Sequence, residues 1–190
     1  MPRGSERKRI RNKIVEILRD ASIPGVDADV FSQRSVPTAH ETLPTILVYQ
    51  KSESNERHDQ TPKTYQRFMQ LEIEIQTTHD NDAQLADEMD DLSQHVENAI
   101  EQADKILLSM KDDQGDPALI NDYNLLSSLY DVNGDASNPI GTIRLIYQFE
   151  YYTNEERPEH LDNFEKMETT FKANDNQNMD AKDVQEFPTA

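Results

Sequence analysis

Residues 65–78 read Tyr-Gln-Arg-Phe-Met-Gln-Leu-Glu-Ile-Glu-Ile-Gln-Thr-Thr, and this stretch decides the fold. Apolar side chains at Met69, Leu71, Ile73 and Ile75 alternate with polar ones. That period of two is typical of a β-strand with one buried face and one polar face. The segment therefore predicts a long strand of an antiparallel sheet.

Other strands are expected before and after this segment. Residues 45–49 form a compact β-rich run, 141–152 alternate well, and 119–131 are rich in leucine with a mixed period. The hydrophilic stretch 51–64 is expected to be a long hairpin loop. A turn around Asn133-Gly134 favours a hairpin between the last two strands.

Two helices are expected from apolar spacing. Residues 6–20 place Ile10, Ile14, Ile17 and Leu18 on one face, and the Pro24-Gly25 turn follows. Residues 83–109 carry a continuous apolar stripe, preceded by the helix-start sequence Asp80-Asn81-Asp82.

The economical architecture is α+β, with one twisted, mainly antiparallel sheet packed against two helices and an extended C-terminal arm. Residues 1–152 are expected to form the domain. Residues 153–190 are polar and are expected to form an arm that is partly helical and docked on a neighbour. The candidate anchors of this arm lie at helical spacing: Leu161, Phe164, Met167 and Phe171.

Composition narrows the class of function. The formal net charge of −18 argues against a non-specific grip on DNA, because neutralising phosphates requires Lys and Arg. The chain has no cysteine, no apolar run of the ~18 residues that a membrane span needs, and no signal segment after its basic start. We therefore expect a protein without membrane contact that is assembled in a reducing cytoplasm.

Basic residues crowd the start of this acidic chain. A basic end on an acidic body can favour head-to-tail association of identical copies. The alternative is an ordinary solvated face of an amphipathic helix. The candidate subunit-interface residues are Arg7, Lys8, Arg9 and Arg11.

Few residues suggest chemistry. The five histidines are scattered, and no cysteine completes a zinc set. Asp131, Asn133, Asp135 and Ser137 have a calcium-loop spacing, but Ala136 stands where that loop needs glycine. We expect no catalytic residue, no metal and no cofactor.

Glu72 and Glu74 share one face of the central strand. Paired carboxylates can perform acid–base work, although an ordinary solvated strand face has the same pattern. A third interpretation makes them an acidic lining that repels nucleic acid in a channel.

The order of these segments resembles a known family. The basic helix leads into Ala21-Ser-Ile-Pro-Gly-Val, and the strand Leu43-Pro-Thr-Ile-Leu-Val-Tyr follows. After the loop ending in Thr61-Pro come Leu71-Glu-Ile-Glu-Ile, then Leu92-Ser-Gln-His-Val-Glu-Asn-Ala-Ile, and finally Gly141-Thr-Ile-Arg-Leu-Ile-Tyr. Over residues 6–152 this order of segments resembles that of the tail terminator proteins of long-tailed bacteriophages, the lambda type included.

The resemblance implies a non-enzymatic virion protein at the head–tail junction. Such a protein forms a hexameric ring that caps the tail tube, stops its polymerisation and joins it to the head connector. DNA passes through the lumen without specific binding, and Glu72 and Glu74 become candidates for the lumen lining. The family pattern does not include residues 153–190.

Two rival functions remain open. One is another head–tail connector component, such as a head-completion or stopper protein. The other is a metal-dependent nuclease that uses Glu72, Glu74 and aspartates of 80–91, although the strand Leu71–Gln76 contains no lysine to assist it.

Overall fold

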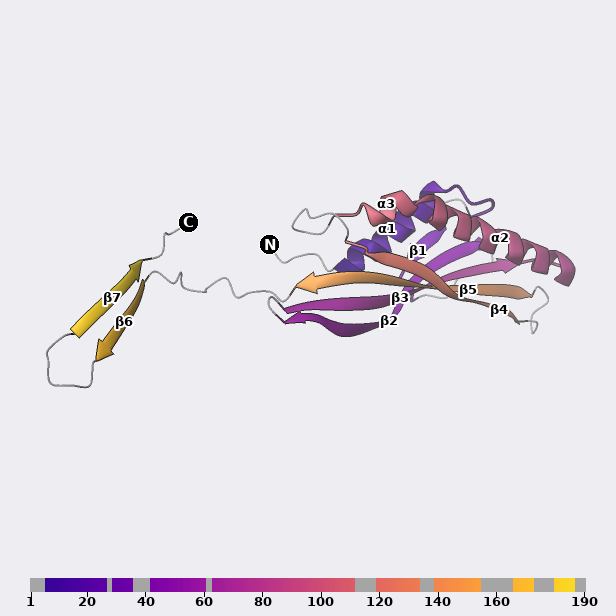
Figure 1. The fold of residues 1–190 in the computed structure, drawn as a ribbon. Coiled ribbons are helices and arrows are strands. Elements are labelled where there is room, and N and C mark those ends of the chain that lie inside the picture. The colour runs from indigo at the N-terminus through magenta and orange to yellow at the C-terminus, as the bar shows by residue number, and fades with distance from the viewer. Residues whose placement is uncertain are drawn as a thin grey trace. The chain divides into compact units, whose positions relative to one another are not determined.

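The computed structural model describes residues 6–26, 29–35, 42–60, 63–111, 119–133, 139–154, 166–172 and 180–186 (Figure 1). The chain divides into two compact units, Met1–Glu155 and Glu156–Ala190. The described parts of the first unit contain a five-stranded sheet and three helices, so the α+β prediction is confirmed.

The sheet is mixed and mainly antiparallel. Its strands are β1 (Val30–Ser32), β2 (Thr45–Gln60), β3 (Lys63–Thr78), β4 (Asp122–Asn133) and β5 (Ile140–Asn154), in the order β1-β2-β3-β5-β4. Only the β1–β2 pair is parallel among these neighbours. β3 pairs with β5 from Thr64 to Thr78, so the stretch that decides the fold lies at the centre of the sheet.

Three helices lie on one side of the sheet. They are α1 (Glu6–Asp20), α2 (Asp82–Gln102) and the short α3 (Asp104–Leu108). α1 ends before a turn in which Gly25 has a φ of +78°, a conformation that glycine adopts without strain. The helix expected over 83–109 is interrupted at Ala103, whose φ of −86° and ψ of 4° lie outside the helical range.

The start of α2 is fixed by its capping residue. The Asn81 side chain accepts hydrogen bonds from the backbone N–H groups of Ala83 and Gln84, at 2.9 and 3.3 Å. This satisfies two of the amides that every helix leaves unpaired at its first turn. The helix-start chemistry expected from Asp80-Asn81-Asp82 is therefore confirmed.

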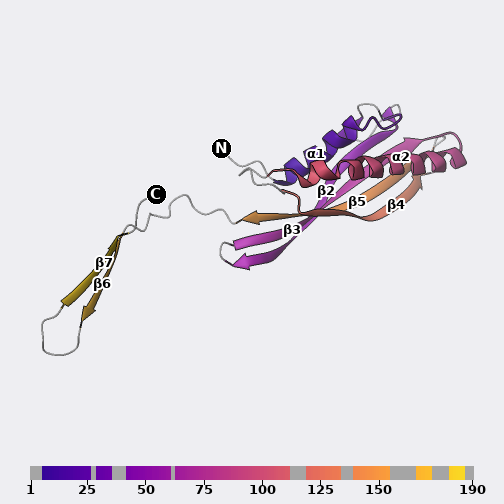
Figure 2. The same ribbon diagram turned by 45° about the horizontal axis from the view of Figure 1, so that its top comes forward.

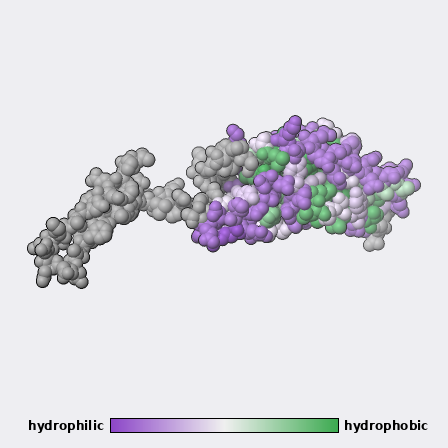
Figure 3. All heavy atoms as spheres, viewed as in Figure 1, coloured by the Kyte–Doolittle hydropathy of each residue, from purple (hydrophilic) through white to green (hydrophobic). Residues whose placement is uncertain are grey.

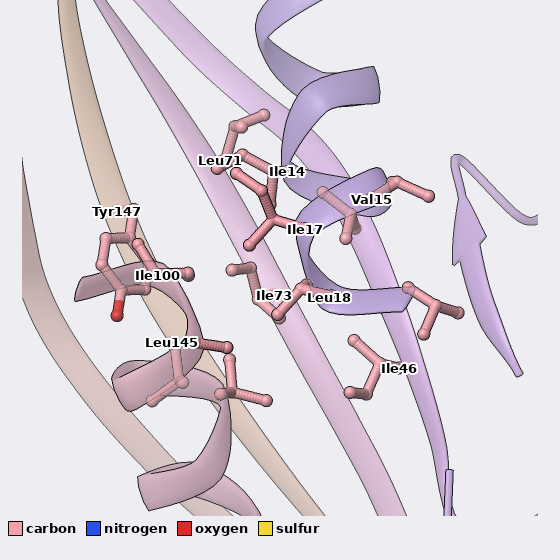
Figure 4. Packing of buried hydrophobic residues seen from close by; sticks show 14 of the residues in the cluster. Ile14, Val15, Ile17, Leu18, Ile46, Leu71, Ile73, Ile100, Leu145 and Tyr147 are labelled. Carbon is pink, nitrogen blue, oxygen red and sulfur yellow. The ribbon is translucent and has the colours of Figure 1, made fainter. Parts of the chain in front are cut away.

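The core lies between the helices and the sheet. In Figures 1 and 2 both long helices cover the same face of the sheet, α1 toward β1 and α2 toward β5. Figure 4 shows Ile14 and Ile17 of α1 and Ile100 of α2 directed at Leu71, Ile73 and Leu145 of the strands. The alternating residues Met69, Leu71, Ile73 and Ile75 are all fully buried, as their period predicted.

The expected loop over 51–64 is wrong. β2 continues to Gln60 and β3 begins at Lys63, so these residues pair as strands and extend the sheet. Their side chains are mostly exposed, and the apolar alternation that reveals a strand is therefore missing. Backbone pairing with β3, itself paired with β5 as far as Asn154, holds the extension together. We call this extension, residues 51–60 with 63–68 and 150–154, the β-arm.

The second unit also differs from its prediction. Residues 166–172 form strand β6 (Lys166–Lys172), which pairs antiparallel with β7 (Asp180–Glu186). Met167 and Phe171 therefore lie in a strand and not in a helix. The helix prediction failed because a spacing of four residues fits the period of a helix and that of a strand equally well. Leu161 and Phe164 lie outside the described residues.

α2 packs closely on the sheet at Gly141. A Cβ atom at this position would overlap Met89 Sδ and would lie 3.2 Å from Leu85 Cδ1. We predict that Gly141→Ala lowers the free energy of unfolding by about 1–3 kcal/mol, since overpacking forces neighbours out of place. Denaturant unfolding measures this loss.

The matched test of this contact is the double variant Gly141→Ala/Met89→Ala. Removing the Met89 side chain relieves the overlap, so the double variant should lose less stability than the two single losses added together. Additive losses would contradict the proposed clash.

Candidate functional site

The sheet face opposite the helices carries the candidate carboxylates. Glu72 and Glu74 both lie on this open face, and each meets a cation from an adjacent strand. Lys51 Nζ lies 2.9 Å from Glu72 Oε1, and Arg144 Nε donates to Glu74 Oε2 at 3.2 Å. Gln76 Nε2 also donates to Glu74 Oε1, at 2.6 Å. Both carboxylates are thus neutralised within the subunit.

This pairing changes how the open face would meet nucleic acid. Glu72 is buried, and Glu74 is only partly exposed. Their charges are compensated by Lys51 and Arg144, so they form no strongly repulsive pair. Equally, the two cations are engaged and are not free to neutralise phosphates. Around Glu72 and Glu74, the charges of the open face are therefore paired.

The four basic candidates of α1 do not form one cluster. Arg7 binds Glu53 of β2, and Arg9 Nη2 donates to the backbone carbonyl of Lys111. Lys8 is exposed, whereas Arg11 is half-buried and its Nε has no hydrogen-bond partner among the described residues. At least Arg7 and Arg9 therefore also have roles inside the subunit.

A network around Glu53 was not predicted from the sequence. The Glu53 carboxylate accepts from Arg7 Nε and Nη2 at 2.8 and 2.6 Å, from Arg67 Nη1 at 2.7 Å and from the Tyr151 hydroxyl at 2.6 Å. It joins α1, β2, β3 and β5 where the sheet leaves the helical layer. The structure places Glu53 opposite buried Met69 and therefore on the helical face, and no apolar alternation in the sequence around Glu53 indicates this.

Electrostatics explain why this carboxylate stays ionised. Burial of Glu53 alone would raise its pKa, but the hydrogen bonds from Tyr151, Arg7 and Arg67 outweigh burial and hold the pKa below its usual value. The pKa of Arg7 is raised in turn, chiefly by its hydrogen bond to Glu53. The network closes the end of the apolar core and anchors the base of the β-arm.

β4 forms one edge of the sheet and is held to the helices by two tyrosines. The Tyr130 hydroxyl lies 3.2 Å from Ser93 Oγ, and the Tyr123 hydroxyl donates to Asp104 Oδ1 at 3.2 Å. Burial first, and then the hydrogen bond to Asp104, raise the pKa of Tyr123 to about 12. Several apolar side chains of β4 nevertheless remain exposed: Leu126, Leu129, Tyr130 and Val132.

The described residues offer no constellation for metal chemistry. No group of three or more His, Asp or Glu side chains among them is placed to hold a metal ion. Asp131 and Asn133 of the calcium-loop spacing belong to β4, while Asp135 and Ser137 lie outside the described residues. The ring centroids of His58 and Tyr152 lie 4.9 Å apart, and His79 Nδ1 accepts a hydrogen bond from the Asn81 backbone N–H.

Among the helices that are described, none is long and apolar enough to cross a membrane.

Comparison with known proteins finds similarity to solved structures. No family model matches the chain, and no curated protein matches it. Among solved structures, a chain from the virion of a native gene transfer agent particle is similar with a TM-score of 0.42 and 13% sequence identity. The match covers 74% of this chain and 92% of that chain.

We predict that Glu53→Gln lowers the free energy of unfolding at pH 7 by about 2 kcal/mol, because Arg7 and Arg67 lose their charged acceptor. A carboxylate with a depressed pKa stabilises the folded state above its unfolded pKa, and the stabilisation is lost as the pH falls through the folded value. The difference between wild type and variant should therefore shrink below about pH 4.5.

Glu56→Gln is the matched control for this prediction. Glu56 is exposed on the same strand, on the opposite face, and its substitution should stay within about 0.5 kcal/mol of wild type at every pH. Equal losses for Glu53→Gln and Glu56→Gln in denaturant unfolding would show that the network contributes nothing special.

Proposed function

We propose that this chain is a structural protein of a bacteriophage virion and acts as a tail terminator. In this function, six copies form a ring on the last ring of the tail tube, stop tube polymerisation and offer a surface to the head connector. One observation carries the proposal. The residues that resemble tail terminators, 6–152, make up one continuous unit with helix, strands, central strand, long helix and strand pair in that order.

The surfaces of this unit suit an element of a wall. One face of the sheet is covered by α1 and α2, while the other face is open and polar. Covalently continuous strands carry the β-arm beyond the helical layer, and the Glu53 network anchors it. A projecting, anchored extension of three strands is a means by which one ring can contact the next along a tube.

The charges of the open face fit the passage of DNA without binding. A surface whose cations are already paired with Glu72 and Glu74 gains less from neutralising phosphates than one with unpaired cations. The net charge of −18 adds long-range repulsion. If the open face lines the lumen, Glu72 and Glu74 act there by neutralising Lys51 and Arg144. The net charge of the whole chain then supplies the repulsion of DNA.

Assembly tests the proposal directly. We expect the purified chain to form a closed ring by native mass spectrometry and electron microscopy. When it is added to tail-tube subunits of the same virus, tubes should become shorter as its concentration rises, with density at one tube end only.

Two outcomes would overturn the proposal. One is a protein that stays monomeric and leaves tube length unchanged at every concentration. The other is a ring that binds only to the head-side connector and never to tube ends, which would favour the stopper function.

A divalent-metal titration separates the proposal from the nuclease alternative. We predict that calorimetry shows no saturable Mg²⁺ site, and that Glu72→Gln/Glu74→Gln gives the same trace as wild type, because both carboxylates are occupied by cations. Saturable binding that disappears in the double variant, together with DNA cleavage, would establish the enzyme instead.

A further inference from the structure

The two edges of the sheet are very different. β1 contributes three residues, and Arg19 of α1 donates from Nε and Nη2 to the Val30 carbonyl, at 3.1 and 2.6 Å. β4 contributes twelve residues and has no strand beyond it among the described ones. Leu129 is 50% exposed and Val132 is 53% exposed on that strand. Long apolar edges attract another chain unless they are covered.

The β4 side of the subunit is also acidic. α2 contains seven acidic residues and neither Lys nor Arg, and β4 adds Asp122 and Asp131 with no cation. Glu101 and Asp122 lie near enough to Tyr123 for their charges to help raise its pKa. By register, Asp122 and Asp131 lie opposite Glu150 and Thr142 on the open face, whereas Glu101 of α2 lies on the helical face. Acidic residues therefore border β4 on both faces of the sheet. We call β4 together with the acidic face of α2 the edge surface.

The opposite side of the subunit is basic. α1 carries six basic and three acidic residues. At about 100° per residue, Lys8, Arg11 and Arg19 fall within roughly 80° of one another. The bond from Arg19 to Val30 shows that this sector of the helix faces the β1 side. None of the three has an acidic partner among the described residues. We call these three residues the basic flank.

We infer that the edge surface of one copy docks against the basic flank of the next copy. The inference rests on the proposed ring and specifies its lateral interface. The occupant follows from charge, because a second edge surface would bring two acidic helices together, whereas the basic flank brings opposite charges. Unlike surfaces in contact make a heterologous interface, which closes into a ring when the rotation between copies allows it.

The contact also explains the exposed apolar residues. In Figure 3 the surface of the first unit is mostly hydrophilic, and hydrophobic residues come through it in separate patches. The aliphatic stems of Lys and Arg cover apolar surface well while their charged ends bind elsewhere. Leu129 lies opposite Arg144 on the open face and Val132 opposite Gly141 on the helical face, so different stems would cover them. The charged ends would meet Asp131 beside Leu129, the acidic residues of α2 on the helical face and the outward carbonyls of the strand.

Two variants in the full chain test this geometry. The edge variant, Leu129→Lys/Val132→Lys, places charge on the exposed apolar edge. The flank variant, Lys8→Glu/Arg19→Glu, reverses the basic flank. The control, Ser54→Lys/Glu56→Lys, adds lysines at exposed positions of the β-arm, away from both surfaces. Lys8→Glu/Asn12→Glu reverses charge in the same sector and leaves the Arg19 bond intact, in case the flank variant does not fold.

Native mass spectrometry at matched protein concentrations measures the oligomeric state of each variant. We expect wild type and control to form rings, and each variant alone to be monomeric, with association weakened at least tenfold. Mixing the edge variant with the flank variant should give heterodimers and nothing larger, because the mixture contains one intact pair of surfaces. This outcome is specific to a heterologous interface.

Several results would overturn the inference. The inference fails if the wild type is monomeric, if the edge variant forms rings, or if the flank variant dimerises by itself. It also fails if the mixture of the two variants contains no heterodimers. A tube-capping assay on the same variants distinguishes failure of the proposed interface from failure of the proposed tail-terminator function. Variants that form rings and cap tubes like wild type would remove the interface alone, whereas a wild type that does neither would remove the ring as well.

Discussion

The burial of one face of β3 against two helices is the constraint on which the structure depends. Met69, Leu71, Ile73 and Ile75 form the floor of the core, and both neighbouring strands take their register from the same strand. A slip of one residue would turn Glu72 and Glu74 into the core and expose the apolar side chains. The positions of the ion pairs, the Glu53 network and the β-arm all follow from this register.

Electrostatics divide the molecule into regions with different tasks. On the open face, Glu72 and Glu74 are each paired with a cation, and at the base of the β-arm three residues donate four hydrogen bonds to the Glu53 carboxylate. On the two flanks the charges remain separated, basic along α1 and acidic along α2 and β4. Internal pairs of this kind fix local geometry, while separated charges act at longer range and set orientation between molecules.

Much of the fold could be predicted because its apolar residues are periodic. The spacing of apolar residues in α1, α2, β3 and β5 indicates which side chains are buried, and the burial of those side chains holds the helices on the sheet. The β-arm could not be predicted in this way, since exposed residues of β2 such as Ser54 and Glu56 pair through the backbone and leave no apolar pattern. For the same reason Glu53 was missed, because its partners Arg7 and Tyr151 lie 46 and 98 residues away in the sequence. Glu72 and Glu74 were placed on the correct strand face, but their cations come from other strands.

The bond from Arg19 to Val30 has a consequence for solubility. A sheet with two open edges can add copies at both ends, and such addition has no natural limit. Here the Val30 carbonyl of the short first strand is already occupied by a guanidinium, so this acceptor is not available to a further strand. The Arg19 side chain thereby makes the β1 edge a poorer template for strand-by-strand growth than the β4 edge, and covering an edge in this way is one means by which proteins limit aggregation.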